Sequence, residues 1–163
     1  MTFHTAQVCL NGHVITAFAD ICHDRNRKFC PACGEPTIRA CPKPGCEGRI
    51  IGKESYEMCP IVEDMNEPPG FCHDCGAAYP WTDRKKAALA EAIDELDQLP
   101  ESDREKLKQS IPDVIQDTPK TQTAAARFTR AISAAGQFGG KMLSDVMTNV
   151  ATAAVLNLMG LKP

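Results

Sequence analysis

Eight residues that could bind a transition metal form four closely spaced pairs in the first half of the chain. The pairs are Cys9 with His13, Cys30 with Cys33, Cys41 with Cys46, and Cys72 with Cys75. Thiolate sulfur and imidazole nitrogen are donors that zinc prefers, and such short spacings let both side chains of a pair reach one ion. Four pairs complete two tetrahedral sites, so we predict two structural zinc ions per chain.

The grouping of the pairs follows from their order along the chain. We group the first pair with the second and the third with the fourth, which gives one site of three cysteines and a histidine and one site of four cysteines. A cross-braced grouping uses the same ligands, and the short connection between the second and third pairs only makes it less favourable. The adjacent Cys22 and His23 are an alternative to His13, but the spacing of His13 from Cys9 matches a ligand pair.

Two cysteines remain outside the pairs, and all nine cysteines of the chain precede Trp81. An odd number of cysteines, without a secretory signal in the sequence, argues against a disulfide framework and favours metal binding in a reducing cytoplasm. We therefore interpret Cys22 and Cys59 as small buried or half-buried thiols, with a redox-sensitive pair as the alternative. His73, between two ligands, is expected to face solvent.

The four pairs lie in short motifs with a fixed order. They read Cys-x-Asn-Gly-His, Phe-Cys-Pro-x-Cys-Gly, a Cys-Pro pair, and Phe-Cys-x-x-Cys-Gly followed by Tyr-Pro-Trp. This order, over about residues 7–81, resembles bacterial double zinc-ribbon proteins of unknown function. The resemblance implies two structural zinc ions, a bacterial cytoplasmic setting and ribbons that serve as interaction modules, but it transfers no activity.

The distribution of the cysteines divides the 163 residues into segments of different character. Residues 1–81 are predicted to form a tandem zinc ribbon, a small β module organised by metal. Residues 82–117 are expected to form a helical hairpin or connector, and residues 118–163 an amphipathic helical tail rich in alanine and glycine. The predicted fold class is therefore α+β by segment, with an all-α region after the ribbons.

The connector is predicted from its capping and breaking residues. Thr82 is expected to cap a helix that ends near residue 99, before Pro100. Residues 102–105 form a capping box that should open a shorter helix ending at Pro112. Residues 112–123 contain several turn-forming residues and are interpreted as a linker.

The tail is predicted to contain an alanine-rich helix from about Thr123 to Gly136 and a final helix from Lys141 to about Met159. The Gly139-Gly140 pair should interrupt the helices and act as a hinge. A membrane span is disfavoured by Asp145, Asn149 and Asn157, and a membrane-surface helix by its lack of a basic face. We favour a helical bundle or an oligomer built on the apolar face.

Charge and motif content narrow the function. The formal net charge of −3 falls to about −6 when seven thiolates bind two zinc ions, which disfavours nucleic-acid binding. The basic clusters at residues 25–28 and 84–86 are short. An acidic loop between Cys46 and Cys72, with Glu54, Glu57, Glu63, Asp64 and Glu67, is interpreted as solvated surface, with a docking patch for a basic partner as the alternative.

No catalytic set, phosphate-binding loop or open metal site is evident, so the protein is predicted not to be an enzyme. The leading hypothesis is a zinc-binding interaction or adaptor protein in the cytoplasm, whose ribbon docks a protein partner while the C-terminal helices mediate oligomerisation. A membrane-associating effector that binds lipid through its last helix is the first alternative. A nucleic-acid-binding zinc ribbon is the second.

Overall fold

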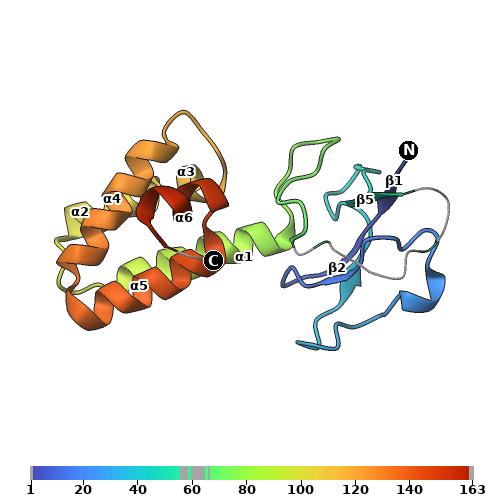
Figure 1. The fold of residues 1–163 in the computed structure, drawn as a ribbon, viewed down its shortest axis with the longest axis horizontal. Coiled ribbons are helices and arrows are strands. Elements are labelled where there is room, and N and C mark those ends of the chain that lie inside the picture. Colours follow the sequence, from blue (N-terminus) through green and yellow to red (C-terminus); the bar gives the residue numbers. More distant parts are fainter. Residues whose placement is uncertain (1, 56–58, 60–64, 66, 162–163) are drawn as a thin grey trace. The chain divides into compact units, whose positions relative to one another are not determined.

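A computed structural model describes residues 2–55, 59, 65 and 67–161. The chain divides into two compact units, Met1–Asp83 and Arg84–Pro163. The described strands lie in the first unit, whereas helices dominate the second (Figure 1). Of the prediction of a small β module followed by an all-α region, the α+β arrangement by segment is therefore confirmed.

The first unit contains two small antiparallel sheets among its described residues. One sheet pairs β1 (Thr2–Thr5) with β5 (Ile51–Ser55), and the other has the strand order β3 (Val14–Thr16), β2 (Gln7–Cys9), β4 (Thr37–Ile38). A 3-10 turn, η1 (His23–Arg25), follows β3. Because β1 and β2 are separated by one residue, the start of the chain contributes a strand to each sheet.

The core of the first unit is small. Its main cluster contains Ala6, Val8, Cys41, Ile50, Cys72, Tyr79 and Trp81. The rings of Tyr79 and Trp81 stack with their centroids 4.7 Å apart. A second cluster contains Ala17, Phe18 and Cys22. Two of the seven residues in the main cluster are predicted metal ligands, so the core and the candidate sites are built together.

The helices are α1 (Pro80–Asp94), α2 (Glu101–Gln109), α3 (Pro112–Ile115), α4 (Thr121–Ala134), α5 (Gly136–Val150) and α6 (Ala153–Met159). One apolar core joins side chains from every helix, and Phe128 of α4 is its largest fully buried member. The segment 118–163 thus shares its core with residues of α1 to α3. Residues such as Leu143, Met147 and Val150, expected on the apolar face of the tail, are buried in this core.

The predicted helix caps are wrong at both places. Helix α1 begins at Pro80, so Thr82 lies within its first turn, and the Thr82 hydroxyl donates to the Gly70 carbonyl at 2.7 Å. Proline suits the first helical position because its missing N–H has no intrahelical partner there. Helix α2 begins at Glu101 after Pro100, which makes no side-chain cap, and Ser102 therefore lies inside the helix.

The predicted hinge in the tail is also wrong. Helix α5 runs through Gly139 and Gly140, and both glycines are buried. A Cβ atom on Gly140 would lie 2.4 Å from the carbonyl oxygen of Ile132, so glycine is required by the close approach of α4. The breaks lie on either side of α5: one between α4 and α5, where Gly136 has a φ of +71°, and one before α6, where the Thr152 side chain accepts from the Val155 amide.

A helix that crosses a bilayer must be both long and mostly apolar. Within the part of the chain that the structure describes, none is both long enough and apolar enough to cross a membrane.

Candidate metal centres

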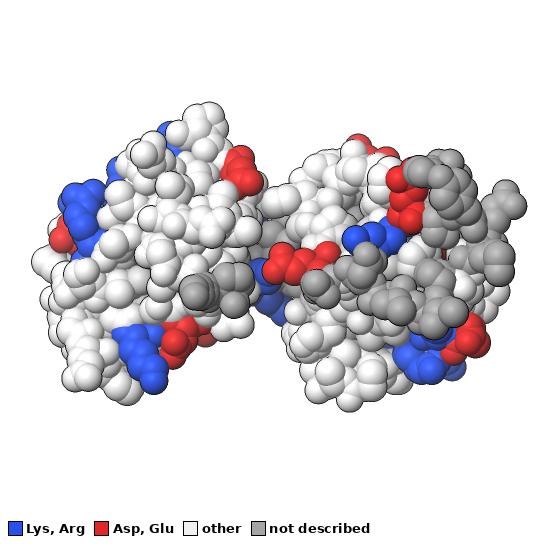
Figure 2. All heavy atoms as spheres, viewed as in Figure 1, with Lys and Arg blue, Asp and Glu red and all other residues white. Residues whose placement is uncertain are grey.

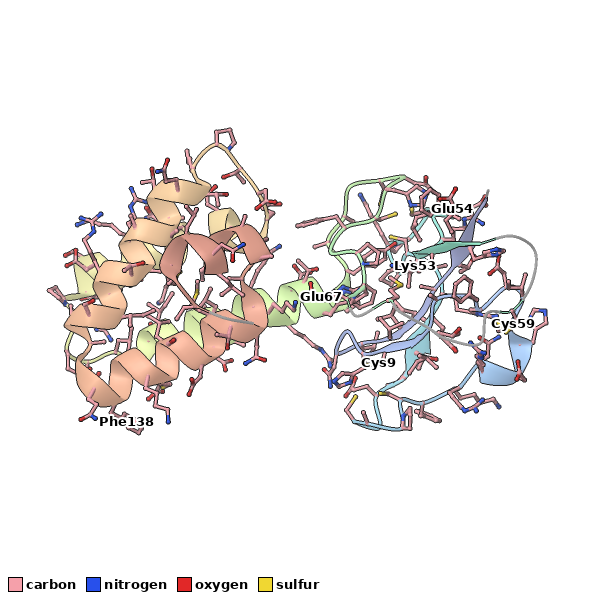
Figure 3. All side chains as sticks on the ribbon, viewed as in Figure 1. Cys9, Lys53, Glu54, Cys59, Glu67 and Phe138 are labelled. Atoms are coloured by element: carbon pink, nitrogen blue, oxygen red, sulfur yellow. A yellow bond between two sulfur atoms is a disulfide. The ribbon has the colours of Figure 1, made fainter. Side chains whose placement is uncertain are left out.

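The first cluster joins the end of β2 to the turn after Phe29. Cys9 is the last residue of β2, His13 precedes β3, and Cys30 and Cys33 lie in a turn closed by the bridge between Phe29 and Pro36. The ligand atoms of these four residues all lie within 4.8 Å of one another. Figure 3 shows where Cys9 lies in the first unit.

The distances within the first cluster describe a tetrahedron around one point. The Cys9 and Cys33 sulfurs are 3.8 Å apart, and His13 Nδ1 lies 3.5 Å from both the Cys9 and the Cys30 sulfur. Four donors at metal–ligand distances of about 2.0–2.3 Å produce edges of this length. His13 therefore presents Nδ1 to the centre of the cluster.

The local backbone positions the first ligand pair. The His13 amide donates to the Cys9 sulfur at 3.2 Å, which requires a sharp turn between them. Gly12 adopts a φ of +91° in this turn, and a Cβ atom there would lie 3.0 Å from Cβ of Trp81. Glycine is thus favoured at this position both by conformation and by space.

The second cluster repeats this construction with four cysteines. Cys41 and Cys46 lie beside the bridge between Ala40 and Arg49, and Cys72 and Cys75 lie in the turn closed by the bridge between Phe71 and Ala78. The Cys41 sulfur is 3.8 Å from that of Cys75, and the Cys46 sulfur is 3.8 Å from that of Cys72. All four sulfurs lie within 4.8 Å of one another.

The turns at the second and fourth pairs are built in the same way. The Gly34 amide donates to the Cys30 carbonyl at 2.8 Å, and the Gly76 amide donates to the Cys72 carbonyl at the same distance. Both glycines have a positive φ. The repeated Phe-Cys-x-x-Cys-Gly motif therefore encodes the same turn twice.

Backbone N–H groups prepare one thiol in each cluster for metal binding. The Glu35 amide lowers the pKa of Cys33 to about 6, and the Cys75 amide lowers the pKa of Cys72 to about 6. Burial, by contrast, raises the pKa of Cys9. Metals bind the thiolate, so each cluster contains one residue that ionises near neutral pH before any metal arrives.

The two clusters differ in their surroundings. In the first, Cys9 and Cys30 are buried but His13 and Cys33 are exposed, whereas in the second, all four cysteines are buried or half-buried. The Tyr79 hydroxyl is buried beside the second cluster and makes no hydrogen bond of normal geometry with any described residue. Burial and then the negative charge of Cys72 raise its pKa, so this hydroxyl stays protonated.

The structure brings together the eight residues that the sequence grouped, in the sequential arrangement. Cys22 and His23 do not join the first cluster; His23 is exposed in η1. His73 is exposed, and its Nε2 lies 3.0 Å from Oδ1 of Asp74. Of the predicted acidic loop, Glu54 and Glu67 are exposed (Figure 3), whereas Glu57, Glu63 and Asp64 lie outside the described residues.

The two remaining cysteines were expected to be separate thiols, with a redox-sensitive pair as the alternative. They form a disulfide instead. Cys22 and Cys59 are bonded, with their Cα atoms 5.5 Å apart and a sequence separation of 37. Cys22 is buried and Cys59 is exposed. Each lies midway in sequence between the two ligand pairs of one cluster, but this placement does not set the distance between the two loops.

A polar pair near the disulfide, formed by the buried His4 and the exposed Asp20, was not predicted from the sequence. His4 Nδ1 lies 3.1 Å from Asp20 Oδ2, and the Thr5 amide donates to Asp20 Oδ1 at 3.0 Å. Burial opposes ionisation of Asp20, but the Thr5 amide and His4 outweigh it and lower its pKa. The pair ties β1 to the turn that precedes Cys22.

A hollow of about 330 Å³ lies beside the first cluster. Its lining includes the apolar Val14, Ile15 and Pro31 together with Arg25 and Arg27. Nearby in sequence, the side chain of Phe29 is 61% exposed. The first cluster thus lies next to a surface that combines apolar and basic groups.

Comparison with known proteins gives one match. Residues 2–159 match the model of a family described as uncharacterized proteins conserved in bacteria (DUF2321). No curated protein and no solved structure matches the chain. The family match includes the helical unit, so it extends well beyond the resemblance over residues 7–81.

Proposed function

The chain belongs to the bacterial family DUF2321, and we propose that it is a non-enzymatic zinc-binding interaction protein whose first unit is a double zinc ribbon. The observation that carries this proposal is the presence of two clusters, each with four side-chain donors around one point. Tetrahedral zinc with zinc–sulfur distances of about 2.3 Å has sulfur–sulfur edges of about 3.8 Å. The sulfur separations of 3.8 Å in both clusters fit this ion.

A structural role for the zinc follows from the number of donors. A catalytic zinc site has three protein ligands and keeps one position for water or substrate. Each cluster here supplies four side chains, which leaves a tetrahedral ion no open position. Zinc bound in this way contributes about 10 kcal/mol or more per ion to folding and holds the surrounding loops in place.

The surface beside the first cluster supports docking of a protein partner. Exposed aromatic and arginine side chains are enriched among the residues that dominate binding energy at interfaces. Arg27 is exposed and lines the hollow together with Val14 and Ile15, and Phe29, two residues further along the chain, is exposed as well. We expect the partner to present an acidic segment with an apolar side chain.

Self-association through the helices has less support than docking by the ribbons. The apolar stripe of α5 packs in the core of its own unit, where Leu143 and Met147 are fully buried. The large apolar side chains that the structure leaves exposed on the described helices are Phe138, at 86%, and Leu158, at 54%. Phe138 points away from the neighbouring helices (Figure 3).

Native mass determination of the metal-loaded protein tests the metal centre and the assembly together. The expected result is two zinc ions per chain, and the same spectrum gives the number of subunits. A single ion per chain, or a chain that folds normally without metal, would overturn the proposal.

Docking is tested by crosslinking in the host bacterium with the variants Phe29→Ala and Phe138→Ala. We expect the crosslinked protein partners to be lost with Phe29→Ala and retained with Phe138→Ala, because only Phe29 lies beside the first cluster. Equal losses, or none, would contradict docking at this surface.

A further inference from the structure

A second hollow lies in the helical unit, which contains none of the predicted metal ligands. Its volume is about 280 Å³, and it is formed by the end of the α1–α2 connection, α2 and α4. The lining consists of Leu99, Asp103, Lys106, Leu107, Arg127, Arg130, Ala131 and Ala134. Leu99, Leu107 and Ala131 are buried and form an apolar floor, whereas the charged residues are exposed around it.

Two arginines of α4 provide the positive charge of the rim. Arg127 and Arg130 are one helical turn apart, and α4 contains no acidic residue. Residues three apart on a helix project from the same face, so both guanidinium groups lie on one side of the hollow. Figure 2 shows basic side chains gathered over α2 and α4 on this face of the unit.

Arg127 is held in place by a buried hydroxyl. Its Nη1 donates to Ser110 Oγ at 2.8 Å, and Ser110, which is 1% exposed, donates in turn to the Lys106 carbonyl at 2.9 Å. Arg130 is oriented by its Nε, which donates to the Ala126 carbonyl at 3.2 Å. Both guanidinium groups are therefore partly ordered before a ligand arrives, which reduces the entropy lost on binding.

The other two charges of the rim largely cancel. Lys106 Nζ lies 3.0 Å from Asp103 Oδ1, so this pair adds little net charge to the hollow. The two arginines remain as the net positive charge above an apolar floor. A ligand that matches both features has an anionic head and an apolar tail.

We propose that this hollow binds a medium-chain fatty carboxylate, with the carboxylate on Arg127 and Arg130 and the alkyl chain on Leu99, Leu107 and Ala131. Guanidinium forms bidentate hydrogen bonds with a planar carboxylate, and this geometry favours arginine over lysine at such a head-group site. The volume lies at the lower end of the range for small-molecule sites, which suits one alkyl chain better than a helix of a protein partner.

The binding test uses calorimetric titration of the full-length, metal-loaded protein with decanoate below its aggregation concentration. We expect saturable binding of one decanoate per chain. Acetate carries the head without the tail and decanol the tail without the head, so each should bind at least tenfold more weakly. Binding of decanol as tight as that of decanoate would overturn the role of the arginines.

Substitutions of charged residues inside and outside the hollow show where decanoate binds. Arg130→Gln should weaken decanoate binding by about tenfold or more, because a hydrogen bond to a charged group is lost. Lys141→Gln, on α5 and outside the hollow, makes the same change in charge and should leave binding unchanged. Asp103→Asn should tighten binding by removing a negative charge from the rim.

A variant that fills the hollow distinguishes loss of the binding site from loss of folding. Ala134 is exposed at the rim, so Ala134→Trp should occupy the hollow without disturbing the core, and thermal unfolding of the helical unit should stay unchanged while decanoate binding is lost. Undiminished binding to Ala134→Trp or Arg130→Gln would overturn the proposal. Binding to anionic vesicles without binding of dissolved decanoate would also overturn it, since that indicates surface attraction. The zinc count does not bear on these outcomes, so the two proposals fail separately.

Discussion

The two units of this chain have nearly the same length but are stabilised in different ways. Among the described residues, the largest apolar cluster of the first unit contains seven buried residues, two of them cysteines of a metal cluster, whereas that of the second contains sixteen. Small cores rarely offset the conformational entropy lost on folding unless a metal or a disulfide is added. The first unit has a disulfide and two clusters positioned to hold metal ions, whereas the second contains no cysteine and, among its described residues, no such cluster.

Metal removal should show the difference in stability between the two units most clearly. A strong chelator is expected to unfold the first unit, because each ion contributes about 10 kcal/mol or more to its folding, and to leave the second folded. Trp81 is the only tryptophan and is buried in the first unit, so its fluorescence reports on that unit, while helical circular dichroism reports mainly on the second. Loss of both signals together would show that the units do not fold independently.

Removing the largest buried side chain of the helical core should instead weaken the second unit and leave the first unchanged. Phe128→Ala is expected to destabilise the second unit by about 3–5 kcal/mol, through lost burial and the cavity that remains. Denaturant unfolding followed by circular dichroism measures this change, and the zinc content should not alter. Phe138→Ala is the matched control, because Phe138 is 86% exposed and its loss should change stability little.

Opening the disulfide should weaken only the first unit. Cys22→Ser removes a crosslink between residues 37 apart, and such loops typically contribute about 2–4 kcal/mol. The expected result is a lower midpoint of denaturant unfolding by Trp81 fluorescence, with two zinc ions still bound. Loss of zinc from this variant would mean that the disulfide is needed to form the metal sites.

Substitutions at two neighbouring glycines test how tightly the helices of the second unit pack. Gly140→Ala should destabilise it by about 1–3 kcal/mol, because the new Cβ would lie 2.4 Å from a backbone carbonyl that cannot move freely. Gly139→Ala meets a side-chain methyl of Leu96 at 3.2 Å, which can shift. The gain in helix propensity should then make Gly139→Ala nearly neutral in thermal unfolding.

The smallest expected effect is the contribution of ionised Asp20 to the stability of the first unit, which depends on pH. The pKa of Asp20 is below its ordinary value of 3.8, so its ionised form stabilises the folded state. That contribution is complete above pH 3.8 and is lost as pH falls through the lower, folded-state pKa. Zinc leaves its thiolate ligands in the same acidic range, so the contribution is measured at neutral pH, where it is complete. Asp20→Asn should lower the denaturant midpoint of the metal-loaded first unit there, and an unchanged midpoint would contradict the assignment.

The parts of this molecule that could be predicted from sequence are those set by local spacing. The pairs from Cys9 to Cys75 place their donors through turns of a few residues, and glycines such as Gly34 and Gly76 mark those turns. Helix periodicity likewise located α4 to within two residues at its start. Such features depend little on what the rest of the chain does.

The features that escaped prediction depend on contacts between distant residues. Gly139-Gly140 has the composition of a hinge, and only the approach of α4 shows that the pair is a packing surface. The bond between Cys22 and Cys59 joins two loops whose separation no local pattern sets. Ser102 resembles a cap, but Pro100 had already fixed the start of α2.

The disulfide also changes how the first unit would respond to mechanical force. It closes a covalent ring of residues 22–59, which contains the pair Cys30 and Cys33 from one cluster and the pair Cys41 and Cys46 from the other. The remaining pairs lie outside the ring, one on each side. With both ions bound, tension between the ends of the unit passes through two metal centres, and the length stored inside the ring cannot be pulled out while the disulfide is intact, even after a coordination bond breaks.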